Sequence, residues 1–294
     1  MRKSISDYRA LARMTMKGHY GIFLLAFVIQ VFIQSSVSQI FTALLSGQQS
    51  NIMIGIYFLL EIMVSLIILV PINIGINGFF VKAISGDYDI KNIFHPFKHN
   101  LSNVIKVNFL MQLKLFLWYL IPWIIGMAAI VGITMALAGS WLNNIITQLG
   151  ATVSDIENFV TGKADMPQNL EVFAAVYSVL LIISILFMIP GIIKNFEYAM
   201  IPYILGEDEN ISSKDAFRMT KEMMKKNKLR YIGLMLSFIG WILLGLIAFG
   251  VGIIFVMPYI NTAAAHFYID AKSRTKMPSG NDFYMNDDGG NFGI

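Results

Sequence analysis

The sequence predicts an all-α protein, a polytopic membrane helix bundle of about six transmembrane helices with a kinked fourth helix and a C-terminal helical hairpin. Of its 294 residues, 56% are hydrophobic and only 14% are charged, whereas a soluble domain carries roughly 25% charged residues. The mean hydropathy is +0.64. Five stretches lack Asp, Glu, Lys and Arg, and each is long enough for a span of about 20 residues: 18–60, 62–81, 115–154, 172–193 and 231–269.

The first three spans follow from apolar runs separated by polar turns. Residues 20–45 form the first predicted span, and the polar turn 47–51 separates it from the second, 52–81. Such a short connection indicates a tight helical hairpin. The third span, 115–139, has a tryptophan near each end, which is the spacing expected of two interfacial aromatic belts.

The fourth span, 172–205, contains Pro190 and Gly191. We expect one long helix that is kinked at this pair, because membrane helices tolerate such breaks. Two polar segments flank the six spans. The segment 1–19 is predicted to be cytoplasmic and amphipathic, and the tail 270–294 is predicted to be cytoplasmic and disordered because it is rich in Gly, Asn and Asp.

The last apolar stretch, 231–269, is too long for a single pass. As one straight helix it would reach about 58 Å, roughly twice the hydrocarbon thickness. We therefore expect it to fold back at Phe249–Gly252, where glycine permits a reversal, into helices 231–249 and 253–269. Both helices are barely long enough to cross, so a short or partly re-entrant hairpin is an open alternative.

The distribution of Lys and Arg predicts the orientation. With six passes and both termini in the cytoplasm, 21 of the 22 Lys and Arg residues lie on the cytoplasmic side, and only Lys163 lies outside. If 231–269 crossed only once, the cytoplasmic number would fall to 18. The positive-inside rule therefore favours six passes through a bacterial cell membrane.

The N-terminal segment 1–19 combines a basic and an apolar face. Arg9, Arg13 and Lys17 recur every four residues beside an apolar row made of Ile5, Tyr8, Ala12 and Met16. This pattern is typical of a short helix that lies on the inner membrane surface.

The segment 213–228 repeats this design. Phe217, Thr220 and Met224 form one face, and Ser212 or Ser213 is placed to cap the helix start. The other face is basic: Arg218, Lys221, Lys225 and Lys228. Such a face suits anionic lipid or a membrane-protein partner, although orientation and solubility alone also explain it.

Glu61 is an acidic residue about ten residues into the second predicted span. Intramembrane carboxylates are costly and are candidates for function. In a tight hairpin, Glu61 lies level with the middle of the first span, which predicts an intramembrane polar cluster of Gln34, Ser38, Glu61 and Ser65. The cluster would bind a cation or a proton, or its hydrogen bonds would simply hold the hairpin together.

No motif points to catalysis. The sequence contains no G-x-S-x-G, H-E-x-x-H, Walker or G-x-G-x-x-G motif and no cysteine. His95 and His99 have helical spacing, but Pro96 follows the first and no acidic ligand accompanies them. We therefore expect no enzyme activity, no metal, no cofactor and no nucleic-acid partner.

Several motifs resemble an uncharacterised bacterial integral-membrane family, domain of unknown function nine hundred and seventy-five. The run Ile189–Lys194 is followed by Tyr198–Met200 and Tyr203–Leu205, and the match continues through Ser213–Ala216 to Phe267–Tyr268. In one departure, Lys226 and Asn227 stand where the family usually has glycine. The resemblance implies a six-helix membrane protein and transfers no catalytic residues. The family is also distantly similar to the membrane domain of glycerophosphodiester phosphodiesterases.

These observations predict a non-catalytic membrane module that binds lipid or a membrane-protein partner. The alternative is a small-solute transporter or permease that uses the polar cluster around Glu61.

Overall fold

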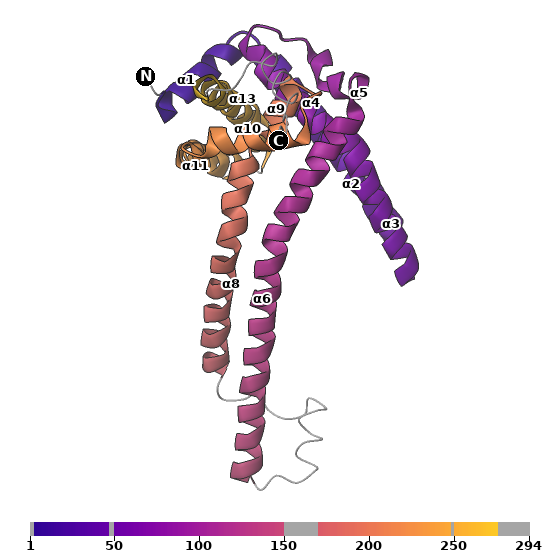
Figure 1. Cartoon of the computed structure of the whole chain (residues 1–294). Helices are drawn as coiled ribbons and strands as arrows, with labels where there is room; N and C mark the ends of the chain where they lie inside the picture. Colours follow the sequence, from indigo (N-terminus) through magenta and orange to yellow (C-terminus); the bar gives the residue numbers. More distant parts are fainter. Residues whose placement is uncertain (1–2, 47–49, 150–169, 248–249, 276–294) are drawn as a thin grey trace, which may run out of the picture. The chain divides into compact units, whose positions relative to one another are not determined.

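The computed structural model describes residues 3–46, 50–149, 170–247 and 250–275, and every element in these ranges is helical (Figure 1). The first residues of the predicted disordered tail 270–294, residues 270–274, form the end of α13, and the residues beyond 275 lie outside the described residues. The chain divides into two compact units: Met1–Gln112 with Phe196–Ile294, and Leu113–Asn195.

The helices of the first unit are α1 (Ile5–Met16), α2 (Tyr20–Leu45), α3 (Asn51–Val64), α4 (Val70–Ile84), α5 (His95–Lys98), α9 (Ile201–Glu207), α10 (Ser213–Met224), α11 (Lys228–Leu236), α12 (Ile239–Ile247) and α13 (Val251–Arg274). A π-helical turn, Ser65–Leu69, joins α3 to α4, and a 3-10 helix, Ile90–Phe94, precedes α5. Residues of both units belong to the two longest helices, α6 (Leu101–Leu149) and α8 (Leu170–Tyr198).

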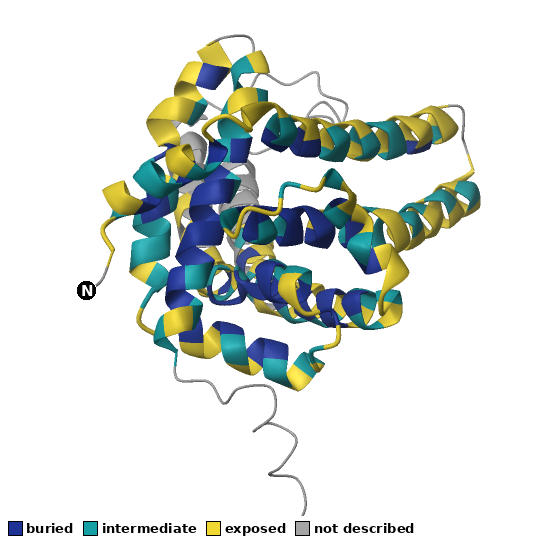
Figure 2. Cartoon of the chain, turned by 90° about the horizontal axis from the view of Figure 1, so that it is seen from above, coloured by how far each residue is buried: buried dark blue, intermediate teal, exposed yellow. Residues whose placement is uncertain are grey.

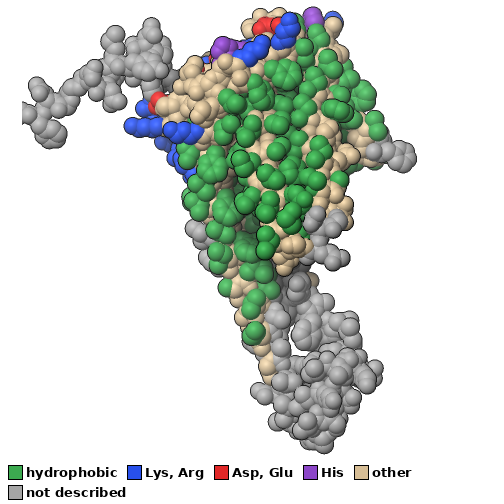
Figure 3. Space-filling model, turned by 90° about the vertical axis from the view of Figure 1, so that its right-hand side faces the viewer, with side chains coloured by type: hydrophobic (Ala, Val, Ile, Leu, Met, Phe, Trp, Pro, Cys, Tyr) green, Lys and Arg blue, Asp and Glu red, His purple; other side chains and the backbone are tan. Residues whose placement is uncertain are grey.

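Five helical stretches are long and apolar enough to cross a membrane: Tyr20–Leu45, Asn51–Ile84, Leu101–Gly132, Lys228–Ile247 and Val251–Arg274. They confirm the prediction of an all-helical chain suited to several membrane passes, while the number of passes stays a prediction. The predicted fourth span falls largely in α8. In the view of Figure 3, apolar side chains cover much of the surface of the described residues, and the charged side chains lie at its top and upper left.

The second predicted span contains a π-helical turn that its sequence explains. Val70 donates its backbone N–H to the carbonyl of Ser65, five residues earlier. Pro71 follows and has no N–H to donate, so the regular α-helical pattern is interrupted there in any case. The wider turn lets the helix continue past the proline with one local change in pitch.

The predicted single helix 172–205 is two helices. α8 continues through Pro190 and Gly191 and ends at Tyr198, and α9 begins at Ile201. The interruption lies just before Pro202, at the start of α9, because proline disfavours helical geometry in the residue before it and suits the first turn of a helix.

Within the second unit, Gly191 permits a close approach between α8 and α6. A Cβ at this position would lie 2.4 Å from Cε1 of Tyr119. One turn further along α8, the ammonium group of Lys194 lies 5.2 Å from the ring centroid of Trp118. The predicted kink residue therefore serves packing.

The core of the first unit is built around α4. The rings of Phe23, Phe79 and Phe80 are fully buried against one another. On another side, Gly78 of α4 meets Gly206 of α9, and a Cβ on Gly78 would lie 2.5 Å from the Gly206 carbonyl oxygen. Buried residues gather where helices cross, while exposed residues cover their free lengths (Figure 2).

Gly78→Ala is expected to destabilise the protein, because the new methyl group meets backbone that has no flexible end to move. Overpacking of this kind costs about 1–3 kcal/mol, which we expect to lower the apparent melting temperature in detergent by several degrees. Gly21→Ala is the matched control, since a Cβ there has no neighbour within 4 Å. Equal melting temperatures for the two variants would contradict the close crossing of α4 and α9.

Candidate functional site

The apolar face of α1 is used inside the protein. Tyr8, Ala12 and Met16 are buried, and α1 packs along α13, as Figure 1 shows. Thr15 Oγ1 lies 2.8 Å from His266 Nε2 of α13. The predicted amphipathic helix therefore forms, but its apolar row binds another helix and is not free to enter lipid.

α10 follows the same principle. Ser212 caps the helix, as one of the two predicted candidates, by accepting a hydrogen bond from the Asp215 backbone N–H at 3.2 Å. Phe217, Thr220 and Met224 of the predicted apolar face are all buried. Because α10 turns this face inward, the opposite face points away from the protein.

Three of the four predicted basic residues lie on that outer face: Arg218, Lys221 and Lys225 are exposed. Arg218 also lies 3.5 Å from the Asp215 carboxylate. Lys226, which is not one of the four predicted residues, is also exposed beside them. We call Arg218, Lys221, Lys225 and Lys226 the basic surface.

Lys228 does not belong to the basic surface, so the prediction was wrong for this residue. Its Nζ lies 2.6 Å from Oε2 of Glu197, whose side chain is only 10% exposed. The Glu197 backbone carbonyl also accepts a hydrogen bond from Thr220 at 2.7 Å. α10 ends at Met224 and Lys228 is the first residue of α11, so the four-residue spacing along α10 does not continue to Lys228.

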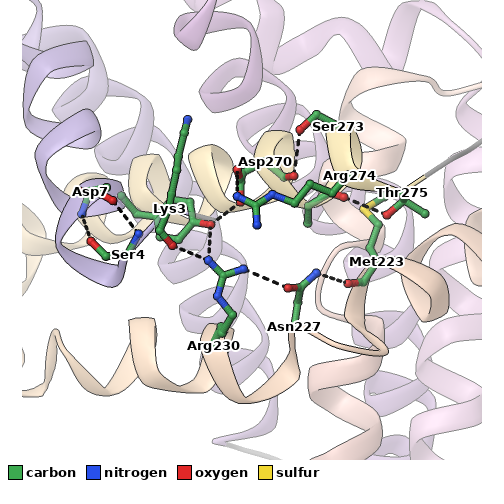
Figure 4. Close-up of polar contacts among 12 residues, drawn as sticks. Lys3, Ser4, Asp7, Met223, Asn227, Arg230, Asp270, Ser273, Arg274 and Thr275 are labelled. Atoms are coloured by element: carbon green, nitrogen blue, oxygen red, sulfur yellow. Dashed lines mark hydrogen bonds and ion pairs between the residues drawn. The ribbon is translucent and has the colours of Figure 1, made fainter. Parts of the chain in front are cut away.

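A polar network ties α1 to the base of the C-terminal hairpin (Figure 4). The Tyr8 hydroxyl donates to Asp270 Oδ2 at 2.5 Å, and Arg274 donates to the other oxygen at 2.6 Å. Arg230 of α11 donates to the Tyr8 hydroxyl at 3.2 Å and to the Lys3 carbonyl at 2.5 Å. Burial, and then the Asp270 carboxylate, raise the pKa of Tyr8 to about 12, so the phenol keeps its proton and donates it.

Two further carboxylates bind partners that are distant in the chain. Glu207 accepts a hydrogen bond from Tyr268 at 2.5 Å and forms an ion pair with Lys272 at 2.6 Å. The buried side chain of Glu209 lies 2.6 Å from His95 Nδ1. These contacts join α9 to α13 and the loop after α9 to α5. Glu207 and Glu209 therefore connect helices that are distant in the sequence.

The two histidines that were considered as metal ligands lie side by side. The rings of His95 and His99 stack with their centroids 4.2 Å apart. Across the described ranges, no group of three or more His, Cys, Asp or Glu is arranged to hold a metal ion. The contact that His95 makes with Glu209 joins two helical segments.

The predicted intramembrane cluster is not assembled through side-chain hydrogen bonds. Glu61 and Ser65 are half-buried, whereas Gln34 and Ser38 are exposed. In the part of the chain that the structure describes, no hydrogen bond or ion pair joins these four side chains. A role for them in solute transport stays a prediction.

The family comparison agrees with the sequence motifs. The family model described as protein of unknown function (DUF975) matches residues 1–275, and the chain belongs to this family. No protein of curated function and no solved structure matches the chain. The distant similarity to glycerophosphodiester phosphodiesterases stays a prediction.

Lys228→Ala and Lys225→Ala should have different effects on stability. Removing Lys228 leaves the Glu197 carboxylate unpaired, at a cost between the roughly 0.2–1 kcal/mol of exposed pairs and the roughly 3–5 kcal/mol of buried ones. Removing the exposed Lys225 should leave stability unchanged. Thermal unfolding of the two variants in detergent measures this, and the same melting temperature for both would contradict the inward position of Lys228.

Proposed function

We propose that the chain is a non-catalytic module of the bacterial cell membrane, with both termini in the cytoplasm, and that its basic surface binds anionic lipid headgroups. One observation supports this most strongly. Directly after Lys225 and Lys226, α11 exposes two leucines: Leu229 is 83% exposed and Leu236 is 58% exposed.

The two leucines share one side of α11. They are seven residues apart, so they lie almost in line along the helix, about 10 Å from each other. A short helix with exposed leucines beside lysines suits the membrane interface, where the apolar side chains enter the acyl region and the ammonium groups contact phosphates. α11 provides this arrangement although α1 and α10 have used their own apolar faces inside the protein.

The charges of the basic surface favour an anionic ligand. Among the described residues, Lys221, Lys225 and Lys226 have no carboxylate within ion-pairing distance. Each cation near an anionic membrane surface contributes about 1 kcal/mol of attraction. By contrast, the buried carboxylates Glu197 and Asp270 are already bonded within the protein, which supports a structural role for them and a non-catalytic module.

The triple variant Lys221→Ala, Lys225→Ala, Lys226→Ala should lose preference for anionic lipid. The protein would be purified from mixed micelles with equal amounts of phosphatidylglycerol and phosphatidylcholine, and native mass spectrometry would count the retained lipids. Because three cations are removed, we expect the enrichment of phosphatidylglycerol to fall about tenfold or more.

The matched control is Lys91→Ala, Lys98→Ala, Lys106→Ala, which removes three exposed lysines of the same unit. It should keep the enrichment of the unmodified protein. An equal loss in both triple variants, or no enrichment in the unmodified protein, would overturn the proposal. A protein retained in stoichiometric amount in place of lipid would favour the membrane-protein partner.

A further inference from the structure

The C-terminal hairpin has two short arms and a tight turn. α12 has nine residues, and α13 begins at Val251 directly after Gly250, whose φ of +79° suits glycine. The arms touch where Gly245 faces Gly252. Among the described residues of the turn, Gly250 donates its backbone N–H to the Leu246 carbonyl, and Ile253 donates to the carbonyl of Gly250.

α1 meets both arms at the same level. On α13, Tyr259 donates from its hydroxyl to the Arg9 carbonyl at 3.2 Å and accepts from Arg13 at 2.9 Å. On the other arm, Phe238 lies just before α12, 5.8 Å below the Arg9 guanidinium carbon. The rings of Phe238 and Tyr259 pack edge to face, 5.1 Å apart. These contacts fix how far the hairpin extends beyond α1.

α1 lies outside the hydrocarbon of the membrane. Its twelve residues include Asp7, Arg9 and Arg13, and Lys17 follows directly. Such a density of charge within the acyl region is prohibitively costly. α2 begins below this level, since Tyr20, its first residue, donates to the carbonyl of Phe255 in the second turn of α13 at 2.6 Å. A span that begins at Tyr20 therefore starts beside the lower part of α13.

The length of each arm below α1 is too small for a crossing. From Ile239 to Gly250 the chain has eleven steps, which reach about 17 Å at most as a helix, and the nine steps from Tyr259 back to Gly250 reach about 14 Å, at about 1.5 Å per residue. The hydrocarbon core is about 30 Å thick. Any tilt of the arms reduces the depth further. By the same measure the 26 residues of α2 extend about 39 Å and are sufficient to cross.

The rest of α13 has no side left for lipid. All seven residues from Thr262 to Tyr268 are buried, and seven consecutive residues cover every direction around a helix. The exposed apolar residues of the hairpin lie instead along α12 and on the first two turns of α13: Ile239, Trp241, Leu243, Leu244, Leu246, Ile247, Val251 and Phe255.

We infer that the α12–α13 hairpin is re-entrant: it enters the leaflet on the side that carries α1, contacts acyl chains with its tip, and returns without crossing. The charge distribution predicts that this side is the cytoplasm. Because both ends of the hairpin stay on one side, the predicted placement of Lys and Arg is unchanged, and the predicted passes fall from six to four. The inference uses none of the residues of the basic surface, so its test is separate from that of lipid selectivity.

The absence of cysteine from the sequence makes the depth of the tip measurable in the full chain. Val251→Cys and Ile247→Cys place a thiol on each arm, at positions 58% and 77% exposed. Each variant would be labelled with bimane, reconstituted into phosphatidylcholine and phosphatidylglycerol vesicles, and quenched by lipids with a nitroxide at the headgroup or in mid-chain. We expect stronger quenching by the mid-chain nitroxide for both positions.

Labelling of intact cells with a membrane-impermeant maleimide gives the second measurement. Met14→Cys, on an exposed position of α1, should react only after permeabilisation. Glu157→Cys, in the segment 140–171 that contains Lys163 and is predicted to lie outside, should react in intact cells. We expect the two hairpin thiols to react more slowly than these controls, both in intact cells and after permeabilisation.

Two results would overturn the inference. Reaction of the hairpin thiols in intact cells at the rate of Glu157→Cys would show that the hairpin crosses. Reaction only after permeabilisation, together with no quenching by the mid-chain nitroxide, would show that the tip lies in the aqueous phase.

Discussion

The burial of α13 is the constraint on which the first unit depends. This helix is enclosed on all sides between Thr262 and Tyr268, and it carries Asp270 into the interior. A buried carboxylate is stable only when its oxygens are bonded, so Tyr8 and Arg274 must stand where they do. α1 is consequently fixed against α13, and the N-terminal segment becomes part of the core.

The fixed position of α1 explains why amphipathic patterns mislead in this chain. A periodic apolar face indicates that a helix packs against apolar groups, and these groups can belong either to lipid or to protein. For α1 and α10 the neighbour is protein, because Tyr8 and Phe217 are buried within the unit. The leucines of α11 have no such neighbour, although the periodicity of their segment is less regular. Exposure, which only the folded structure gives, separates the two cases.

Composition and local signals predicted the features that depend on neighbouring residues. The apolar runs gave the helices suited to membrane passes, Ser212 was one of two candidate caps, and the glycine turn at Gly250 was expected. The candidate site required contacts between distant residues. Tyr8 and Asp270 are 262 positions apart, and Lys228 and Glu197 are 31 positions apart. The periodicity of a sequence does not identify which carboxylate a lysine will pair with. Lys228 was therefore predicted to lie on the solvent-exposed face.

The polar network also fixes the position of the hairpin relative to α1. Arg230 lies on α11, which precedes the hairpin, Asp270 lies near the end of α13, and both bind the hydroxyl of Tyr8. The helices before and at the end of the hairpin are therefore held to one point on α1, and in the proposed arrangement the charges of α1 keep it at the membrane surface. Under the proposed arrangement, the short arms below the contacts of Tyr259 and Phe238 with α1 set the depth of the tip. The exposed leucines of α11 then lie on the approach to the hairpin, so lipid contact extends from the basic surface to the tip along one continuous segment.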